Sequence, residues 1–179
     1  MDNTREVPYV KKAAISLIAI GDALEATALR AVLERFNYRV EVHWVGSRRE
    51  VLEILRGGVE TFPYVILACH GDAHGGVLVP GEPVIGAADL TISLPERIVV
   101  NLGCGTGRAE SAARYLQGGC RAYIAPRAAV EGNAALMFST HLFYFLAQER
   151  PLHEAVRLSR EHDEACGLFD LWAGEEGMR

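Results

Sequence analysis

The chain has 179 residues, half of them hydrophobic and 23% charged, which is the composition of a folded globular protein and not of a disordered one. The formal net charge of −5 argues against the basic surface of a nucleic-acid-binding domain, so we expect no nucleic-acid partner. No apolar stretch approaches the roughly 20 residues of a membrane-spanning helix, and residues 1–12 are too polar for a signal peptide. We therefore expect a cytoplasmic protein without membrane contact.

The length suits one compact domain spanning residues 1–179, with 168–179 as a tail that is either docked or loose. The four cysteines, Cys69, Cys104, Cys120 and Cys166, include no C-x-x-C pair, which argues against a structural zinc site. In the reducing cytosol we expect all four to be free thiols.

Apolar runs along the chain predict buried strands separated by helices. In chain order, strands are expected at 13–20, 39–45, 64–69, 97–102 and 121–125. Helices are expected after Asp22 and Ser47, each of which stands at an N-cap position, and at about 108–116, 131–148 and 151–166. Glycine and proline interrupt this rhythm at 71–95, where we expect a loop with a small hairpin.

Strands that alternate with helices and are apolar throughout are typical of a parallel sheet with both faces covered. The expected fold class is therefore α/β, a three-layer α/β/α sandwich with a mainly parallel sheet. In sheets of this kind, functional side chains collect beyond the carboxyl ends of the strands.

Two chemically active side chains stand at such strand ends. The third expected strand ends at His70 and the fourth leads to Cys104, and a glycine follows each of them. If these strands are neighbours, the imidazole can promote ionisation of a nucleophilic thiol and protonate the leaving group. Gly71 allows a backbone N–H to approach a developing oxyanion, and the helix that begins near residue 108 favours a thiolate through its dipole.

The residues around both positions resemble a known superfamily. The stretches VILACHG at 65–71 and VVNLGCGTG at 99–107 are similar to the two catalytic blocks of the caspase-like (clan CD) cysteine peptidases. The CHAT branch of that superfamily, a bacterial group, is the most similar. The likeness continues through GGCRAYI at 118–124 and covers roughly residues 60–165, although 126–131 lacks the tryptophan common in the family.

The resemblance implies a caspase-like fold, whose sheet is similar to that of flavodoxin-like proteins. We expect the strand order 2-1-3-4-5. It also implies His70 as the catalytic imidazole, Cys104 as the nucleophile, and the backbone amides of Gly71 and Cys104 as the oxyanion hole. Glu131 is, by the same resemblance, an acid of the substrate pocket.

Five acidic or imidazole side chains near these strand ends allow more than one interpretation. Asp22 could line a pocket for a basic substrate side chain, but its simpler role is to cap a helix. Glu131 could equally serve as the acid at a helix N-terminus. His70, Asp72 and His74 form a weak metal-binding pattern on one glycine-rich loop without a partner cluster, so we expect no metal.

The function expected from these features is hydrolysis of a peptide bond through a thioester on Cys104, with His70 shuttling the proton and no cofactor. The substrate would be a protein or peptide. The loops at 71–95 and 126–131 would border the cleft, and a regulatory protein partner could order them. Two alternatives remain open. One is a CHAT-like interaction or regulatory module without turnover. The other is a flavodoxin-like domain for a small ligand, against which the missing phosphate-binding loop argues.

Overall fold

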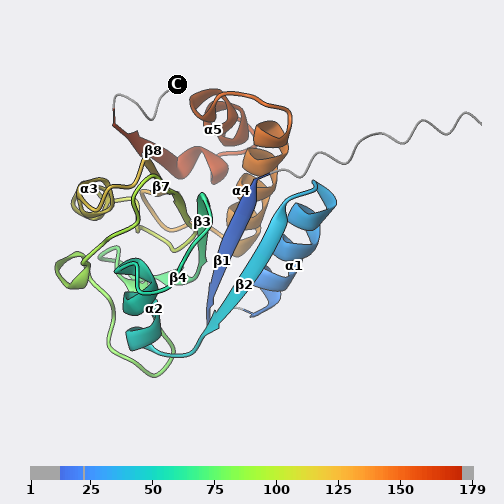
Figure 1. Cartoon of the computed structure of the whole chain (residues 1–179). Helices are drawn as coiled ribbons and strands as arrows, with labels where there is room; N and C mark the ends of the chain where they lie inside the picture. Colours follow the sequence, from blue (N-terminus) through green and yellow to red (C-terminus); the bar gives the residue numbers. More distant parts are fainter. Residues whose placement is uncertain (1–12, 22, 175–179) are drawn as a thin grey trace, which may run out of the picture.

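The structure, a computed structural model, describes residues 13–21 and 23–174. Six strands form one central sheet in the order β2-β1-β3-β6-β7-β8 (Figure 1). These strands are β1 (Ala14–Ile20), β2 (Arg39–Val45), β3 (Tyr64–Ala68), β6 (Ile98–Asn101), β7 (Ala122–Pro126) and β8 (Phe169–Ala173). The α-helices are α1 (Ala23–Arg35), α2 (Arg48–Leu55), α3 (Ala109–Gln117), α4 (Gly132–Ala147) and α5 (Leu152–Arg160).

The first five strands of the sheet are parallel and confirm the expected order 2-1-3-4-5, since β6 and β7 are its fourth and fifth strands along the chain. Nearly every residue of β1, β3, β6 and β7 is buried. Unbroken apolar strands are what a sheet covered on both faces requires, because both sets of alternating side chains enter a core.

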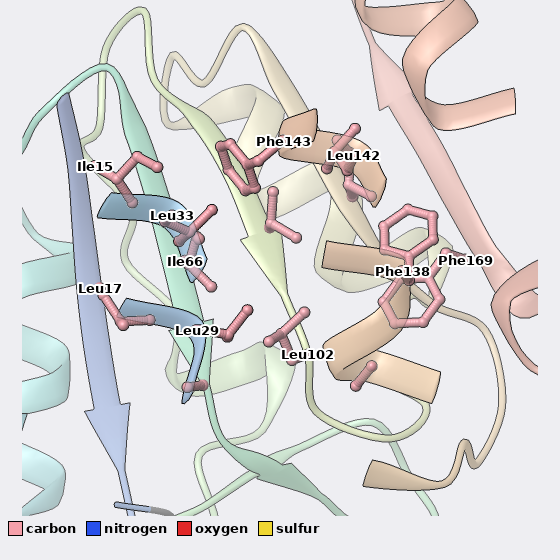
Figure 2. Close-up of a cluster of buried hydrophobic side chains, with 14 of the residues drawn as sticks. Ile15, Leu17, Leu29, Leu33, Ile66, Leu102, Phe138, Leu142, Phe143 and Phe169 are labelled. Atoms are coloured by element: carbon pink, nitrogen blue, oxygen red, sulfur yellow. The ribbon is translucent and has the colours of Figure 1, made fainter. Parts of the chain in front are cut away.

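Helices on both faces of the sheet complete the expected three-layer sandwich (Figure 1). One core lies between the sheet and α1, α4 and α5, and Figure 2 shows Leu29 and Leu33 of α1 beside the strand residues Ile15, Leu17 and Ile66. The other core lies under α2 and α3. Within the described part of the chain, no helix is long and apolar enough to span a membrane.

The C-terminal region differs from the sequence expectation. Helix α5 ends at Arg160 and not at 166, because the chain turns into a short 3₁₀ helix, η2 (Cys166–Leu168), where Asp163 accepts the Cys166 N–H at 2.6 Å. The chain then forms β8 antiparallel to β7, in a segment expected to be part of a tail. Phe169 is fully buried and stacks on Phe138 with 4.0 Å between ring centroids, which ties β8 to α4 (Figure 2).

The expected hairpin lies directly beyond β3. Strand β4 (His70–Gly71) pairs antiparallel with β5 (Val77–Leu78), and Val77 pairs in turn with Ile85. A single 3₁₀ turn, η1 (Ala87–Asp89), follows before β6. The hairpin therefore stands over the carboxyl edge of the sheet, where β3 and β6 end.

Candidate active site

The register of β3 and β6 brings His70 and Cys104 to the same edge of the sheet. The two strands pair in parallel from Tyr64 opposite Ile98 to Leu67 opposite Asn101. His70 and Cys104 each follow this last pair by three residues. Neighbouring strands lie about 4.8 Å apart, so the segments that carry the two residues leave the sheet from adjacent positions.

Gly71 lies directly against the backbone of Cys104. A Cβ atom added to Gly71 would collide with the carbonyl oxygen of Cys104 and come within 2.8 Å of its nitrogen. The glycine is therefore required by the close approach of two backbones, and this contact locks β4 to the turn that carries the thiol.

Two backbone N–H groups at this contact, those of Gly71 and Cys104, have no backbone acceptor among the residues that the structure describes. Val77 exchanges both of its backbone hydrogen bonds with Ile85, at 2.9 and 3.0 Å. A residue in an antiparallel ladder bonds toward one side, so the N–H of Gly71, which lies opposite Val77, is directed away from β5. The N–H of Cys104 meets no acceptor among the residues that the structure describes.

The thiol of Cys104 is half-buried and touches the segment that follows β7. Its Sγ lies 3.3 Å from the carbonyl oxygen of Val130 and 3.4 Å from the Val130 nitrogen. The next residue of the turn, Gly105, donates its N–H to the Ala128 carbonyl at 3.0 Å. Sequence reasoning did not identify Val130 as a contact of the thiol, because the contact depends on how the chain returns after β7.

The other three thiols are buried, which disfavours their ionisation. Burial raises the pKa of Cys69 to about 12, with a smaller contribution from the Glu25 carboxylate. Burial likewise raises the pKa of Cys120 and of Cys166 to about 12. Only a thiolate is strongly nucleophilic, so these three are suited to packing, and Cys104 is the one cysteine that is partly exposed.

The remaining residues expected at the site have different outcomes. His70 is exposed in β4, opposite Leu78. Glu131 is exposed at the N-cap position of α4 without making a side-chain capping bond, and it directly follows Val130. Asp22 lies outside the described residues. The structure therefore brings His70, Gly71, Cys104 and the backbone before Glu131 to one edge.

Asp72 has a structural role in the hairpin. Its Oδ1 accepts the N–H groups of Gly76 at 2.7 Å and His74 at 2.8 Å, and these bonds lower the pKa of the carboxyl. Arg108, which is not part of the hairpin, donates to the carbonyl of Ala73 at 2.6 Å. In the described part of the chain, no group of three or more His, Cys, Asp or Glu side chains is arranged to hold a metal ion.

Comparisons by sequence find no matching family model and no matching curated protein. Solved structures do match. A chain of the Saccharomyces cerevisiae separase–securin complex superposes with a TM-score of 0.61 at 15% identity, covering 89% of this chain and 11% of that one.

The Porphyromonas gingivalis RgpB complex of pro- and mature domains matches with a TM-score of 0.60 at 10% identity, covering 93% of this chain and 48% of that one. The Arg-specific cysteine proteinase gingipain R matches with a TM-score of 0.59 at 12% identity, covering 92% and 46%. This chain thus spans less than half of the gingipain chains and about a ninth of the yeast chain. It has the α/β fold that these proteins share, the caspase-like fold expected from its sequence.

Proposed function

We propose that this protein is a cysteine peptidase that hydrolyses peptide bonds with Cys104 as nucleophile and His70 as general base and acid. The parallel pairing of β3 and β6 supports the proposal, since the segments that carry His70 and Cys104 leave these neighbouring strands at the same edge of the sheet. The half-exposed state of Cys104 supports the assignment over the three buried thiols.

The reaction follows from the groups at this edge. His70 takes the proton of the Cys104 thiol, and the sulfur attacks the carbonyl carbon of the scissile bond. The N–H groups of Gly71 and Cys104 stabilise the oxyanion that forms. His70 then gives its proton to the leaving amine as the C–N bond breaks and leaves a thioester. Water, deprotonated by His70, attacks the thioester and releases the acid and the thiol.

The substrate is proposed to be a protein or peptide with a basic side chain next to the scissile bond. Glu131 supports this preference because its exposed carboxylate follows the residue that touches the Cys104 sulfur and makes no capping bond. Asp22, outside the described residues, is proposed as a second acid of the same pocket. We also propose that the protein belongs to the CHAT branch and that a regulatory protein partner orders the loops at 71–95 and 126–131.

Selective alkylation tests the dyad. At pH 8 a thiol with a pKa of about 12 is ionised in about one molecule in ten thousand, so iodoacetamide should label Cys104 far ahead of Cys69, Cys120 and Cys166. His70→Ala should slow the alkylation of Cys104 at neutral pH, because the imidazole that promotes ionisation of its thiol is gone, whereas the three buried thiols stay unreactive. His74→Ala, an exposed histidine of the same hairpin, is the matched control and should leave the alkylation of Cys104 unchanged.

Turnover is tested on a diverse peptide mixture with mass-spectrometric detection of cleavage. Wild-type protein should cleave it and Cys104→Ser should not. Slow, uniform labelling of all four cysteines, or cleavage that persists in Cys104→Ser, would refute the proposal. Selective labelling without any cleavage would refute the peptidase and favour a module that binds without turnover.

The proposed preference for substrates with a basic side chain is tested separately with Glu131→Gln. Loss of a charge-assisted contact should lower kcat/KM for peptides with a basic side chain by about tenfold and leave neutral peptides unaffected. Glu60→Gln changes an exposed acid that lies just before β3, at the opposite end of that strand, and serves as the control. An equal effect of Glu131→Gln on basic and neutral peptides would contradict the assignment.

A further inference from the structure

Asn101 is a buried polar residue at the end of an otherwise apolar strand. It is the last residue of β6, whose members are all buried, and its exposed fraction is 1%. A carboxamide in such a position is stabilised only if its hydrogen-bonding groups find partners. Its partners therefore show what the residue does.

The side-chain oxygen of Asn101 accepts two hydrogen bonds from two different strand ends. The backbone N–H of Gly103 donates to Oδ1 at 3.0 Å, and the thiol of Cys69 donates to it at 3.3 Å. Cys69 directly precedes His70, and Gly103 directly precedes Cys104. The Asn101 oxygen thus links Cys69 and Gly103, the residues that directly precede the two members of the proposed catalytic pair.

The rest of the turn before and after Cys104 is fixed from the same side. Thr106 donates its hydroxyl to the Gly103 carbonyl at 2.7 Å, and Tyr123 donates its hydroxyl to the Thr106 carbonyl at 3.1 Å. Gly103 has little space for a side chain, since a Cβ there would lie 3.0 Å from both the Cys69 sulfur and a Thr106 methyl carbon. The turn is consequently packed tightly around the Asn101 oxygen.

The amide group of Asn101 completes the orientation. Burial raises the pKa of Tyr115 and Tyr123, and the nearby Asn101 side chain acts against that rise in both phenols. A backbone N–H can only donate, so the side-chain oxygen of Asn101, and not its NH₂, must face Gly103. The side chain therefore has one stable orientation.

We infer that Asn101 is a positioning residue that sets the Cys104 thiol and amide at their height relative to His70. This inference rests on the proposed function. Without the Asn101 oxygen, the buried Gly103 N–H loses its acceptor and the turn must shift to find another. A displacement of about 1 Å at a reacting group lowers a rate by about a hundredfold.

The test uses the alkylation of Cys104 by iodoacetamide as a function of pH, and the separation of kcat from KM in peptide cleavage. In Asn101→Leu, which has a similar volume and no acceptor, both the alkylation rate and kcat should fall by about a hundredfold with KM little changed. Ser16→Ala is the matched control, because Ser16 is equally buried and accepts the Phe62 N–H at 3.0 Å near the start of β3. It should leave both rates at the wild-type value.

Asn101→Asp keeps the acceptor and adds a negative charge. It should recover at least tenfold over Asn101→Leu at high pH, with its alkylation profile shifted to higher pH, because a nearby negative charge disfavours a thiolate. Hydrogen exchange in the wild-type chain is a measurement that needs no variant. The Gly103 amide should be as protected as the amides of β6.

The outcomes separate the two proposals. Unselective alkylation of the wild-type protein would remove the proposed function itself. Selective, His70-dependent alkylation together with wild-type rates in a folded Asn101→Leu would overturn the positioning role alone. Failure of Asn101→Asp to recover any rate, or exchange of the Gly103 amide as fast as a loop amide, would overturn it as well.

Discussion

Replacement of Gly71 by alanine tests the contact that brings the two halves of the proposed site together. The added methyl group would collide with the carbonyl oxygen of Cys104 and lie 2.8 Å from its nitrogen. Both neighbours are backbone atoms, so the conflict cannot be relieved by rotating a side chain. Either β4 or the turn that carries the thiol must move.

The size of the effect follows from this geometry. Overpacking of this kind costs about 1 to 3 kcal/mol. Alanine also restricts the unfolded chain, which returns about 0.4 to 1 kcal/mol. We therefore expect Gly71→Ala to lower the free energy of unfolding by up to about 2.6 kcal/mol, and Tm by up to about 10 °C for a chain of this length.

The effect on reactivity should be larger than the effect on stability. The shift separates Cys104 from His70 and displaces an oxyanion donor, so the alkylation rate at Cys104 and kcat should each fall by about a hundredfold. Thermal unfolding followed by circular dichroism measures the change in stability. Timed alkylation with peptide mapping measures the change in the reactivity of Cys104.

Gly46→Ala is the matched control, because a Cβ at Gly46 would have nothing within 4 Å and its backbone needs no positive φ. It should leave Cys104 reactivity unchanged. If Gly71→Ala had wild-type stability and wild-type reactivity, the close approach of the two backbones would be wrong, and the oxyanion role of Gly71 would fail with it.

Three further predictions concern the framework of the site. Phe169→Ala removes the fully buried ring that stacks on Phe138 and should cost about 3 to 5 kcal/mol in urea unfolding; a cost below 1 kcal/mol would show that β8 is not anchored there. The pKa of Asp72 is lowered by its bonds to backbone N–H groups, chiefly that of Gly76, so its contribution to hairpin stability is present above the unfolded-state pKa of about 3.9 and is lost as pH falls below it. Protection of the Gly76 amide, relative to its intrinsic exchange rate at each pH, should accordingly fall below that pH, and unchanged protection would contradict the role. Ser47→Ala breaks the capping box of α2 and should lower the free energy of unfolding by about 1 kcal/mol, whereas no change would mean that water replaces the cap.

Much of the architecture was predictable because it depends on short-range patterns. Runs such as AISLIAI and YVILA are apolar at every position, and only strands buried on both faces use such runs. Ser47 with Glu50 marks the start of α2 as a capping box. The strand ends near His70 and Cys104 were predictable from the same short-range patterns. The apolar run before His70 stops at His70-Gly71, and the run before Cys104 stops at Gly103.

Other features were not predictable because they depend on contacts between distant segments. Phe169–Ala173 has the apolar character of a docked tail, and only the free edge of β7 makes it a strand. The Val130 contact with the Cys104 sulfur joins residues 26 positions apart. One available signal was overlooked, the polar Asn101 in the otherwise apolar run IVVN.

By itself, the sequence determined the α/β class, the positions of the main strands and the two residues proposed for catalysis, because periodicity and chain-local chemistry encode these directly. The tertiary structure decided that β3 and β6 are neighbours, so that His70 and Cys104 follow strands that end at the same edge of the sheet. It also decided which thiols are buried. Register and burial arise from packing many segments together, so no single stretch of the chain specifies them.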